Sequence, residues 1–253
     1  MAWGVGDNLG SNANSTAGLT GTLTVAGSVA AGNVVVIIIS KDNNGTTDAD
    51  HSEVAGVVDA AGNTYVKAAE YTNGQGAADA GQTVSIWYLK VTNALTSGVT
   101  VITATYGDVA KSSIAAFEFT VAAGSTVSVA GSNQAVGDAA DPAALTLGSL
   151  ASSEYLWIFG IGRETENIGL TQDADYTAFT EVATSGGADA ANSCVGGGYR
   201  IFTGTTDTVD AATTNDVDHV QILVAFLETL AVTLVPSKQM QSILQTQSAL
   251  LRY

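Results

Sequence analysis

Hydrophobic and polar positions alternate along most of this chain in short runs, the pattern of β-strands with one covered face. Leu19–Val25 is typical, because apolar residues alternate there with Thr and Gly. Breaks containing Gly, Asn or Asp separate the other candidate strands, which are Val34–Ile39, Val54–Val58, Thr64–Tyr71, Val84–Val91, Val99–Tyr106, Ile114–Val121, Tyr155–Ile161, Tyr176–Val182, Val195–Phe202 and Val220–Leu227. Many short strands at this spacing predict an all-β antiparallel sandwich or barrel and not an α/β fold.

Two of these candidate strands depart from simple alternation. Val34–Ile39 is β-branched throughout and offers apolar side chains to both faces. We expect either that a loop, an arm or a neighbouring subunit covers its outer face, or that it is a central strand with a partly exposed Val or Ile. Gly196–Gly198 lies inside another strand and predicts a bulge or a close packed crossing.

Aromatic-marked segments recur along the chain at a nearly constant offset. Three pairs lie 111 positions apart (176 − 65, 181 − 70 and 199 − 88): Tyr65 and Tyr176, Glu70 and Glu181, Tyr88 and Tyr199. Phe117 and Phe226 are 109 apart, and Val34–Ile39 corresponds to Leu156–Ile161 at an offset near 121. Chance similarity between β sequences is the alternative. We favour a true repeat: one sandwich over residues 19–228, with half-repeats at about 19–121 and 145–228.

Three segments stand outside this repeat. Residues 1–18 are rich in Gly, Asn and Ser and predict an irregular N-terminal arm, in which Trp3 is expected to dock. About ten extra residues precede Tyr65, which predicts an insertion around 40–58. Residues 229–253 carry the one helical period, with an apolar face of Met240, Ile243, Leu244, Leu250 and Leu251. A helix this short must dock to persist, on its own sandwich, on a partner or on other copies.

The charge distribution separates the tail from the body. The net charge is −16, yet all 24 acidic residues lie at or before Glu228, where six basic residues leave 6 − 24 = −18. Residues 229–253 contain Lys238, Arg252 and no acid. Because residues 1–228 are so acidic, they repel the phosphate backbone of nucleic acids, and we expect no nucleic-acid binding. Val34–Ile39 is too short to cross a bilayer, so we expect no membrane partner.

The first residues lack the charged and apolar regions of a secretory signal peptide. Yet only 13% of the residues are charged, and Thr, Ser, Asn and Gly supply the polarity, as in an extracellular β protein. A virion protein, made in a host cytoplasm and released by lysis, reconciles the two observations. A processed mature chain is the competing explanation.

We find no catalytic motif and predict that the chain is not an enzyme. His51 and His219 lie one in each half and are expected in a solvated loop and beside a strand. Cys194, the single cysteine, is expected to be a small buried residue. Glu164 and Glu166 resemble the paired carboxylates of glycosidases, but a solvated loop is the favoured interpretation.

Acidic D-x-D pairs raise the question of calcium, which takes several oxygen ligands. The pairs are Asp48 and Asp50, Asp173 and Asp175, and Asp216 and Asp218. None has the spacing of an EF-hand loop. We expect simple solvation and no cofactor, with calcium as the open alternative.

Three segments carry a resemblance to a known group of domains: Asp59–Tyr65 (DAAGNTY), Val84–Tyr88 (VSIWY) and Ala116–Phe119 (AFEF). Over residues 15–228 the chain resembles jelly-roll-like β-sandwich domains of tailed-phage structural proteins and some bacterial surface proteins. The resemblance implies a jelly-roll-like sandwich, and it implies no functional residues, because the shared positions look like turn formers and core.

The resemblance leads to the expected function. The chain would be a virion structural protein, a capsid decoration or appendage protein, that binds other virion proteins and forms a homo-oligomer, with a trimer favoured. Its anchoring and assembly contacts would come from Trp3 in the arm and from the apolar face of the tail helix. The alternative is a lectin-like module that binds host glycans, although most aromatic residues fall inside strands, where core packing is the default. A hydrolase is the least favoured reading.

Overall fold

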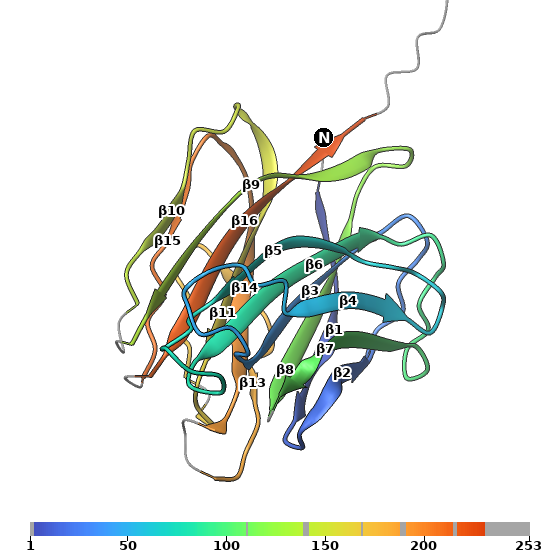
Figure 1. Cartoon of the computed structure of the whole chain (residues 1–253). Coiled ribbons are helices and arrows are strands. Elements are labelled where there is room, and N and C mark those ends of the chain that lie inside the picture. Colours follow the sequence, from blue (N-terminus) through green and yellow to red (C-terminus); the bar gives the residue numbers. More distant parts are fainter. Residues whose placement is uncertain are drawn as a thin grey trace, which may run out of the picture.

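The computed structural model of the chain describes residues 3–109, 111–138, 142–167, 169–187, 191–214 and 217–230 (Figure 1). Within these ranges the protein is all-β, with packed antiparallel sheets and no helix, and therefore no helix that could span a membrane. The antiparallel sandwich predicted from alternation is confirmed at this level. The helix expected in the C-terminal tail, with Met240, Ile243, Leu244, Leu250 and Leu251, lies outside the described residues.

The described strands fall into two sets of eight. The first set is β1 (Gly4–Asn14), β2 (Gly18–Thr24), β3 (Val34–Asp42), β4 (Val54–Asp59), β5 (Val66–Thr72), β6 (Gln82–Lys90), β7 (Val101–Val109) and β8 (Ser112–Thr120). The second set is β9 (Thr126–Gly137), β10 (Leu145–Leu147), β11 (Ser153–Arg163), β12 (Thr177–Ala178), β13 (Val182–Ala183), β14 (Cys194–Gly204), β15 (Asp207–Val209) and β16 (His219–Thr229).

Each set of strands forms one large and one small sheet. In the first half, the order β1-β8-β3-β6-β5 makes an inner sheet and β2-β7-β4 makes an outer sheet. In the second half, β9-β16-β11-β14 continues to β12 and β13 in the inner sheet, and β10-β15 forms the outer sheet. The two inner sheets have the same strand order, because β1, β8, β3, β6 and β5 correspond to β9, β16, β11, β14 and β13.

The two inner sheets pack face to face, and each outer sheet covers the far side of its own inner sheet. The run of apolar residues in β3 is explained by the two cores on either side of this strand. Val34, Val36 and Ile38 enter the central core between the inner sheets. The alternate residues Val35, Ile37 and Ile39 enter the core beneath the first outer sheet. A second sheet of the same half therefore covers the second face of this strand.

β11 repeats this arrangement in the second half. Leu156 and Ile158 face the central core. Trp157 and Phe159 face the core beneath β10 and β15, where Val209 is fully buried. Burying an apolar side chain of this size contributes roughly 1.5–3 kcal/mol, so a strand covered on both faces anchors both of the cores that it separates.

The structure corrects the predicted boundaries of the N-terminal arm and of the half-repeats. Residues 1–18 were expected to be irregular, but Gly4–Asn14 forms β1, which pairs with β8 through two register shifts. Residues 126–137, which lie between the two expected half-repeats, form β9, and β9 pairs with β16 through one register shift. The two sets of strands therefore begin at Gly4 and Thr126, earlier than residues 19 and 145.

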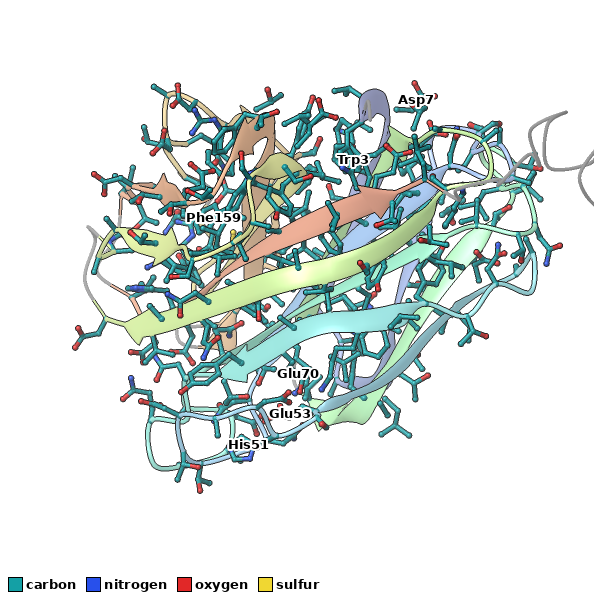
Figure 2. All side chains as sticks on the ribbon, turned by 90° about the horizontal axis from the view of Figure 1, so that it is seen from above. Trp3, Asp7, His51, Glu53, Glu70 and Phe159 are labelled. Atoms are coloured by element: carbon teal, nitrogen blue, oxygen red, sulfur yellow. The ribbon has the colours of Figure 1, made fainter. Side chains whose placement is uncertain are left out.

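Trp3 docks as expected, but in the core of its own chain and not in an assembly contact. Its side chain is 6% exposed and packs in the central core, and its backbone N–H donates to Glu154 Oε1 at 3.0 Å. Figure 2 shows Trp3 beside the ribbon of the sandwich and not projecting from it. A side chain buried within its own chain does not offer the exposed surface that an assembly contact needs.

Candidate functional site: a polar cleft at one end of the sandwich

Glu70 and Glu181, one of the pairs at offset 111, have the same structural task in the two halves. Each carboxylate accepts hydrogen bonds from two consecutive backbone N–H groups: Glu53 and Val54 for Glu70, and Gly169 and Leu170 for Glu181. Each thereby fixes the segment before the next β-pairing. This pairing is β4 with β7 in the first half and the isolated Thr171–Ala212 bridge in the second. These two glutamates hold backbone and are not free for chemistry.

The buried cations are equally committed to structure. Lys41 is fully buried at the end of β3 and donates to Glu53 Oε2, to the Asp42 carbonyl at 2.8 Å and to Asn44 Oδ1 at 3.0 Å. Burial lowers the pKa of Lys41, and the Glu53 carboxylate opposes that change. With all three ammonium protons engaged, Lys41 is a structural cation.

The predicted calcium pairs do not converge on a common site. Asp48 accepts from the Gly74 N–H at 3.0 Å, whereas Asp50 forms an ion pair with Lys67 at 3.1 Å. Within the described ranges, no group of three His, Cys, Asp or Glu side chains is placed to hold a metal ion.

The remaining members of these pairs are also engaged elsewhere. Asp173 accepts from the Asp210 N–H, Asp175 pairs with Arg200, and Asp218 accepts from Gln75 Nε2. Asp216 lies outside the described residues.

The other polar candidates lie apart from one another. His51 is exposed in a loop, with its Nε2 2.8 Å from the Thr47 carbonyl oxygen, and His219 is buried at the start of β16, where burial lowers its pKa. Cys194 is fully buried, and burial raises the pKa of its thiol to about 11, as befits a small core residue. Placed in this way, these groups form no pair of nucleophile and base.

Glu164 and Glu166 separate on opposite sides of their loop. Glu166 is exposed, while Glu164 is 5% exposed. Burial, together with the nearby carboxylates of Asp218 and Asp42, raises the pKa of Glu164 to about 8. The Glu164 backbone N–H donates to the Asp218 carbonyl oxygen at 3.0 Å and so joins two loops. The solvated loop that we predicted is wrong for the buried Glu164.

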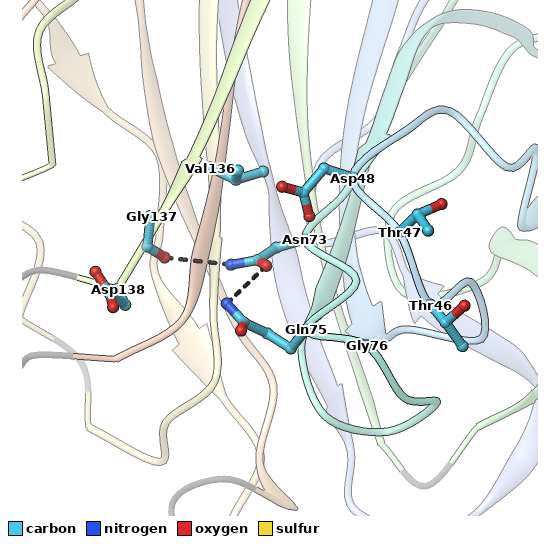
Figure 3. A pocket seen from close by; sticks show the side chains of 9 residues that line it. All are labelled: Thr46, Thr47, Asp48, Asn73, Gln75, Gly76, Val136, Gly137 and Asp138. Carbon is cyan, nitrogen blue, oxygen red and sulfur yellow. Dashed lines mark hydrogen bonds between the residues drawn. The ribbon is translucent and has the colours of Figure 1, made fainter.

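A polar cleft of about 500 Å³ opens where loops of the first half meet the end of β9 (Figure 3). Its lining residues come from three separate segments: Thr46, Thr47 and Asp48; Asn73, Gln75 and Gly76; and Val136, Gly137 and Asp138. The first segment belongs to the insertion around 40–58 that the sequence repeat isolates. The cleft is therefore built on a feature that the second half does not share.

Hydrogen bonds fix the floor of the cleft. Asn73 is 2% exposed and donates through Nδ2 to the carbonyl oxygens of Gly137 at 3.2 Å and His219 at 3.4 Å, which ties the first half to the second. Gln75 Nε2 donates to Asn73 Oδ1 at 2.9 Å and to Asp218 Oδ1 at 2.8 Å. Gln75 has a φ of 43°, a left-handed conformation that is uncommon outside glycine.

The walls of the cleft are held by Asn43, which is fully buried. Its Nδ2 donates to the carbonyl oxygens of Gly45, Gly74 and Ala77, and its Oδ1 accepts from the Ala80 and Gly81 N–H groups. One side chain thus joins the insertion to the loop between β5 and β6. The cleft is preorganised before any ligand arrives.

Comparison of the chain with family models, with curated proteins and with solved structures finds no match.

Proposed function

We propose that this chain is a structural protein of a tailed-phage particle, a capsid decoration or appendage protein that contacts other virion proteins and its own copies, with a trimer favoured. The observation that carries the proposal is the strand order. In the first half, the order β1-β8-β3-β6 faces β2-β7-β4, which supports a jelly-roll-like arrangement. In the second half, the order β9-β16-β11-β14 faces the two-stranded sheet β10-β15, a shorter counterpart. Jelly rolls are frequent in viral capsid and lectin domains.

The use of the buried charges also supports a structural role. Lys41, Glu70 and Glu181 are all engaged in holding backbone and loops. The acidic surface favours solubility on a particle exposed to solvent. Because Trp3 is buried, the assembly contacts that we assigned to both termini are now proposed for the tail alone.

Labelling of particles tests this function. An antibody against the purified chain should bind particles from a lysate of cells that express the gene in its native context, and the chain should co-sediment with those particles in a density gradient. A chain that remains wholly in the soluble fraction of a lysate rich in particles would reject the virion assignment.

Deletion of residues 231–253 tests the anchoring part of the proposal. We expect the truncated chain to keep its β-sheet circular dichroism and its cooperative unfolding, and to lose association with particles and with other copies. A truncated chain that still binds particles would show that the anchor lies in the body.

A lectin-like module that binds host glycans is the second candidate, because the cleft is polar and preorganised. Its weakness is the absence of an aromatic platform, since Trp3, Trp87 and Trp157 are all buried and none lines the cleft. Binding on a glycan array that is lost in Asp138→Asn would favour this candidate over a purely structural role.

A further inference from the structure

The cleft presents two carboxylates, and apart from the hydroxyls of Thr46 and Thr47 its lining side chains have no donor to spare. Both amide groups that could donate from its floor are engaged: Asn73 Nδ2 with the carbonyls of Gly137 and His219, and Gln75 Nε2 with Asn73 and Asp218. The Asp138 carboxylate is exposed and makes no hydrogen bond within the described residues, and Asp48 uses one oxygen on the Gly74 N–H. No Lys or Arg lines the cleft.

The donors and acceptors that line the cleft indicate which kind of ligand it can bind. A sugar needs both donors and acceptors from its site, and it usually also needs an aromatic ring for stacking. A guanidinium or ammonium group supplies donors only, which complements two carboxylates and the Gln75 amide oxygen. Within a body that carries −18 before residue 229, the surrounding field also favours a cation. The cleft therefore suits a basic segment better than a glycan.

The chain itself contains such a segment. Residues 229–253 carry Lys238 and Arg252 and no acidic residue, and they are the part of the sequence with a positive balance. We propose that the cleft of one copy receives the basic tail of a neighbouring copy. This inference rests on the proposed assembly role for the identity of the segment.

The direction of β16 places its last residue far from the cleft of the same chain. His219, at the first residue of β16, lies at the cleft through its contact with Asn73, while Thr229 ends the strand. Eleven residues of strand place these ends roughly 33 Å apart. β16 thus ends on the side of the molecule opposite the cleft. Residues 230–253 span roughly 80 Å when fully extended, which is long enough to return to the same chain. We commit to a neighbour because the proposed assembly role requires contacts between copies. Such a head-to-tail contact closes into a ring, such as a trimer, or continues as a filament.

Sedimentation velocity of the full chain at low and high salt tests the proposal. The cleft variant Asp48→Asn/Asp138→Asn and the tail variant Lys238→Gln/Arg252→Gln should each weaken self-association at least tenfold. The control variant Asp7→Asn/Asp210→Asn removes two exposed carboxylates that line no cleft and should stay within twofold of the wild type. High salt should weaken the wild type because the contact is electrostatic.

Mixing the two defective chains gives a sharper test. The cleft variant keeps its tail and the tail variant keeps its cleft, so the mixture should form one intact contact and stop at a dimer. A two-fold symmetric interface would already stop the wild type at a dimer, and an unrelated interface would ignore both variants.

Several outcomes would overturn the inference. A wild-type chain that stays monomeric at every concentration, self-association that the cleft variant leaves intact, or a mixture that assembles as the wild type does would each reject it. Displacement of the contact by a neutral oligosaccharide would reject the choice of a cation. Because particle labelling does not depend on the cleft, a chain that labels particles but fails these tests would leave the proposed function standing.

Discussion

The two halves of the molecule place a buried cation at the same point of the same strand but neutralise it differently. Lys41 pairs in register with Thr83 of β6, as Arg163 pairs with Cys194 of β14. Lys41 has three hydrogen-bond acceptors, whereas Arg163 donates through Nη2 to Glu181 and Cys194 and leaves Nε and Nη1 without partners among the described residues. The second half therefore depends on a single carboxylate where the first has a network.

A second difference lies on the central core. β3 brings Ile38 to the place where β11 brings Gly160, and the two residues lie against each other across the inner sheets. A Cβ built on Gly160 would lie 3.0 Å from Ile38 Cγ2. The first half contributes a large side chain, Ile38, where the second half has a glycine without one. The two halves share a strand order, but they pack tightly only because their residues at this point differ in size.

The largest effect is expected where the single carboxylate is removed. Glu181→Gln leaves Arg163 buried with no carboxylate partner, so we expect the free energy of unfolding to fall by roughly 3–5 kcal/mol. Glu70→Gln should cost about 1–2 kcal/mol, because Lys41 keeps Glu53. Urea unfolding of both variants at pH 7 measures the difference.

The double variant Arg163→Met/Glu181→Gln is the control for Glu181→Gln. It should recover part of the loss, because it removes the uncompensated charge and keeps an apolar side chain of similar length. Equal losses in Glu70→Gln and Glu181→Gln would mean that the two halves neutralise their cations equally well.

Packing across the inner sheets is expected to give the next largest effect. Ile38→Ala should cost about 2–5 kcal/mol through the cavity that it leaves. Gly160→Ala should cost about 1–3 kcal/mol by overpacking. Because Ile38 and Gly160 are in contact, the double variant should cost at least about 1 kcal/mol less than the sum of the two single losses. Additive losses in thermal and urea unfolding would show that the two positions are independent.

The sequence predicted the strands well and their layering poorly. Alternation is a local signal, so it located most strands. The run Val34–Ile39 left open whether its outer face is covered or partly exposed, and the structure shows that both faces are covered. Alternation could not show that the cover is an outer sheet of the same half, because that depends on pairing between β2, β7 and β4. β1 was missed because its Gly-, Asn- and Ser-rich sequence has low strand propensity, which pairing with β8 overrides.

The sequence repeat identified structurally equivalent tyrosines correctly, but it paired the wrong phenylalanines. If Val34 of β3 is matched to Leu156 of β11, the strand registers match Tyr88 with Tyr199, which pair with Val36 and Ile158. The same match aligns Phe226 with Phe119 and not with Phe117, since Phe119 pairs with Val34 and Phe226 with Leu156. The offset at these strands is therefore 226 − 119 = 107 and not 109.

The cleft had one weak signal in the sequence and no motif. Thr46, Asn73 and Asp138 are far apart along the chain, and no spacing rule connects loops that meet only after the halves pack together. The insertion around 40–58 was the usable signal, because a segment present in one half and absent from the other is free to serve something besides the shared fold.

A smaller effect is expected in the pH dependence of stability, from the carboxyl groups that follow Lys41 and Arg163 in the sequence. Asp42 follows Lys41 as Glu164 follows Arg163, and burial raises the pKa of Asp42 to about 6 and that of Glu164 to about 8. A carboxyl group with a raised pKa binds its proton more tightly in the folded chain. Its stability contribution is therefore full below its ordinary pKa and is lost as pH rises through the folded pKa.

The pH range over which stability is lost should therefore differ between Asp42 in the first half and Glu164 in the second. Asp42→Asn should abolish the part of the stability loss that falls between about pH 4 and 6, and Glu164→Gln the part between about pH 4.5 and 8. At pH 9, Glu164→Gln should raise the free energy of unfolding by roughly 1–3 kcal/mol. Urea unfolding from pH 4 to pH 9 measures this, and an unchanged pH profile in Glu164→Gln would contradict the buried carboxyl.

The smallest effect tests whether the repeated tyrosines are equivalent. Tyr65 donates to Asp59 Oδ2 at 3.0 Å, and Tyr176 donates to Asp207 Oδ2 at 2.6 Å, each beneath the outer sheet of its own half. Each carboxylate keeps other donors when the hydroxyl is removed, such as the Asn63 side chain for Asp59 and Arg200 for Asp207. Tyr65→Phe and Tyr176→Phe should therefore each lower the free energy of unfolding by only about 1 kcal/mol, with values that agree within about 0.5 kcal/mol. A loss confined to one variant in parallel urea titrations would show that the tyrosines, although repeated in sequence, do different work in the two halves.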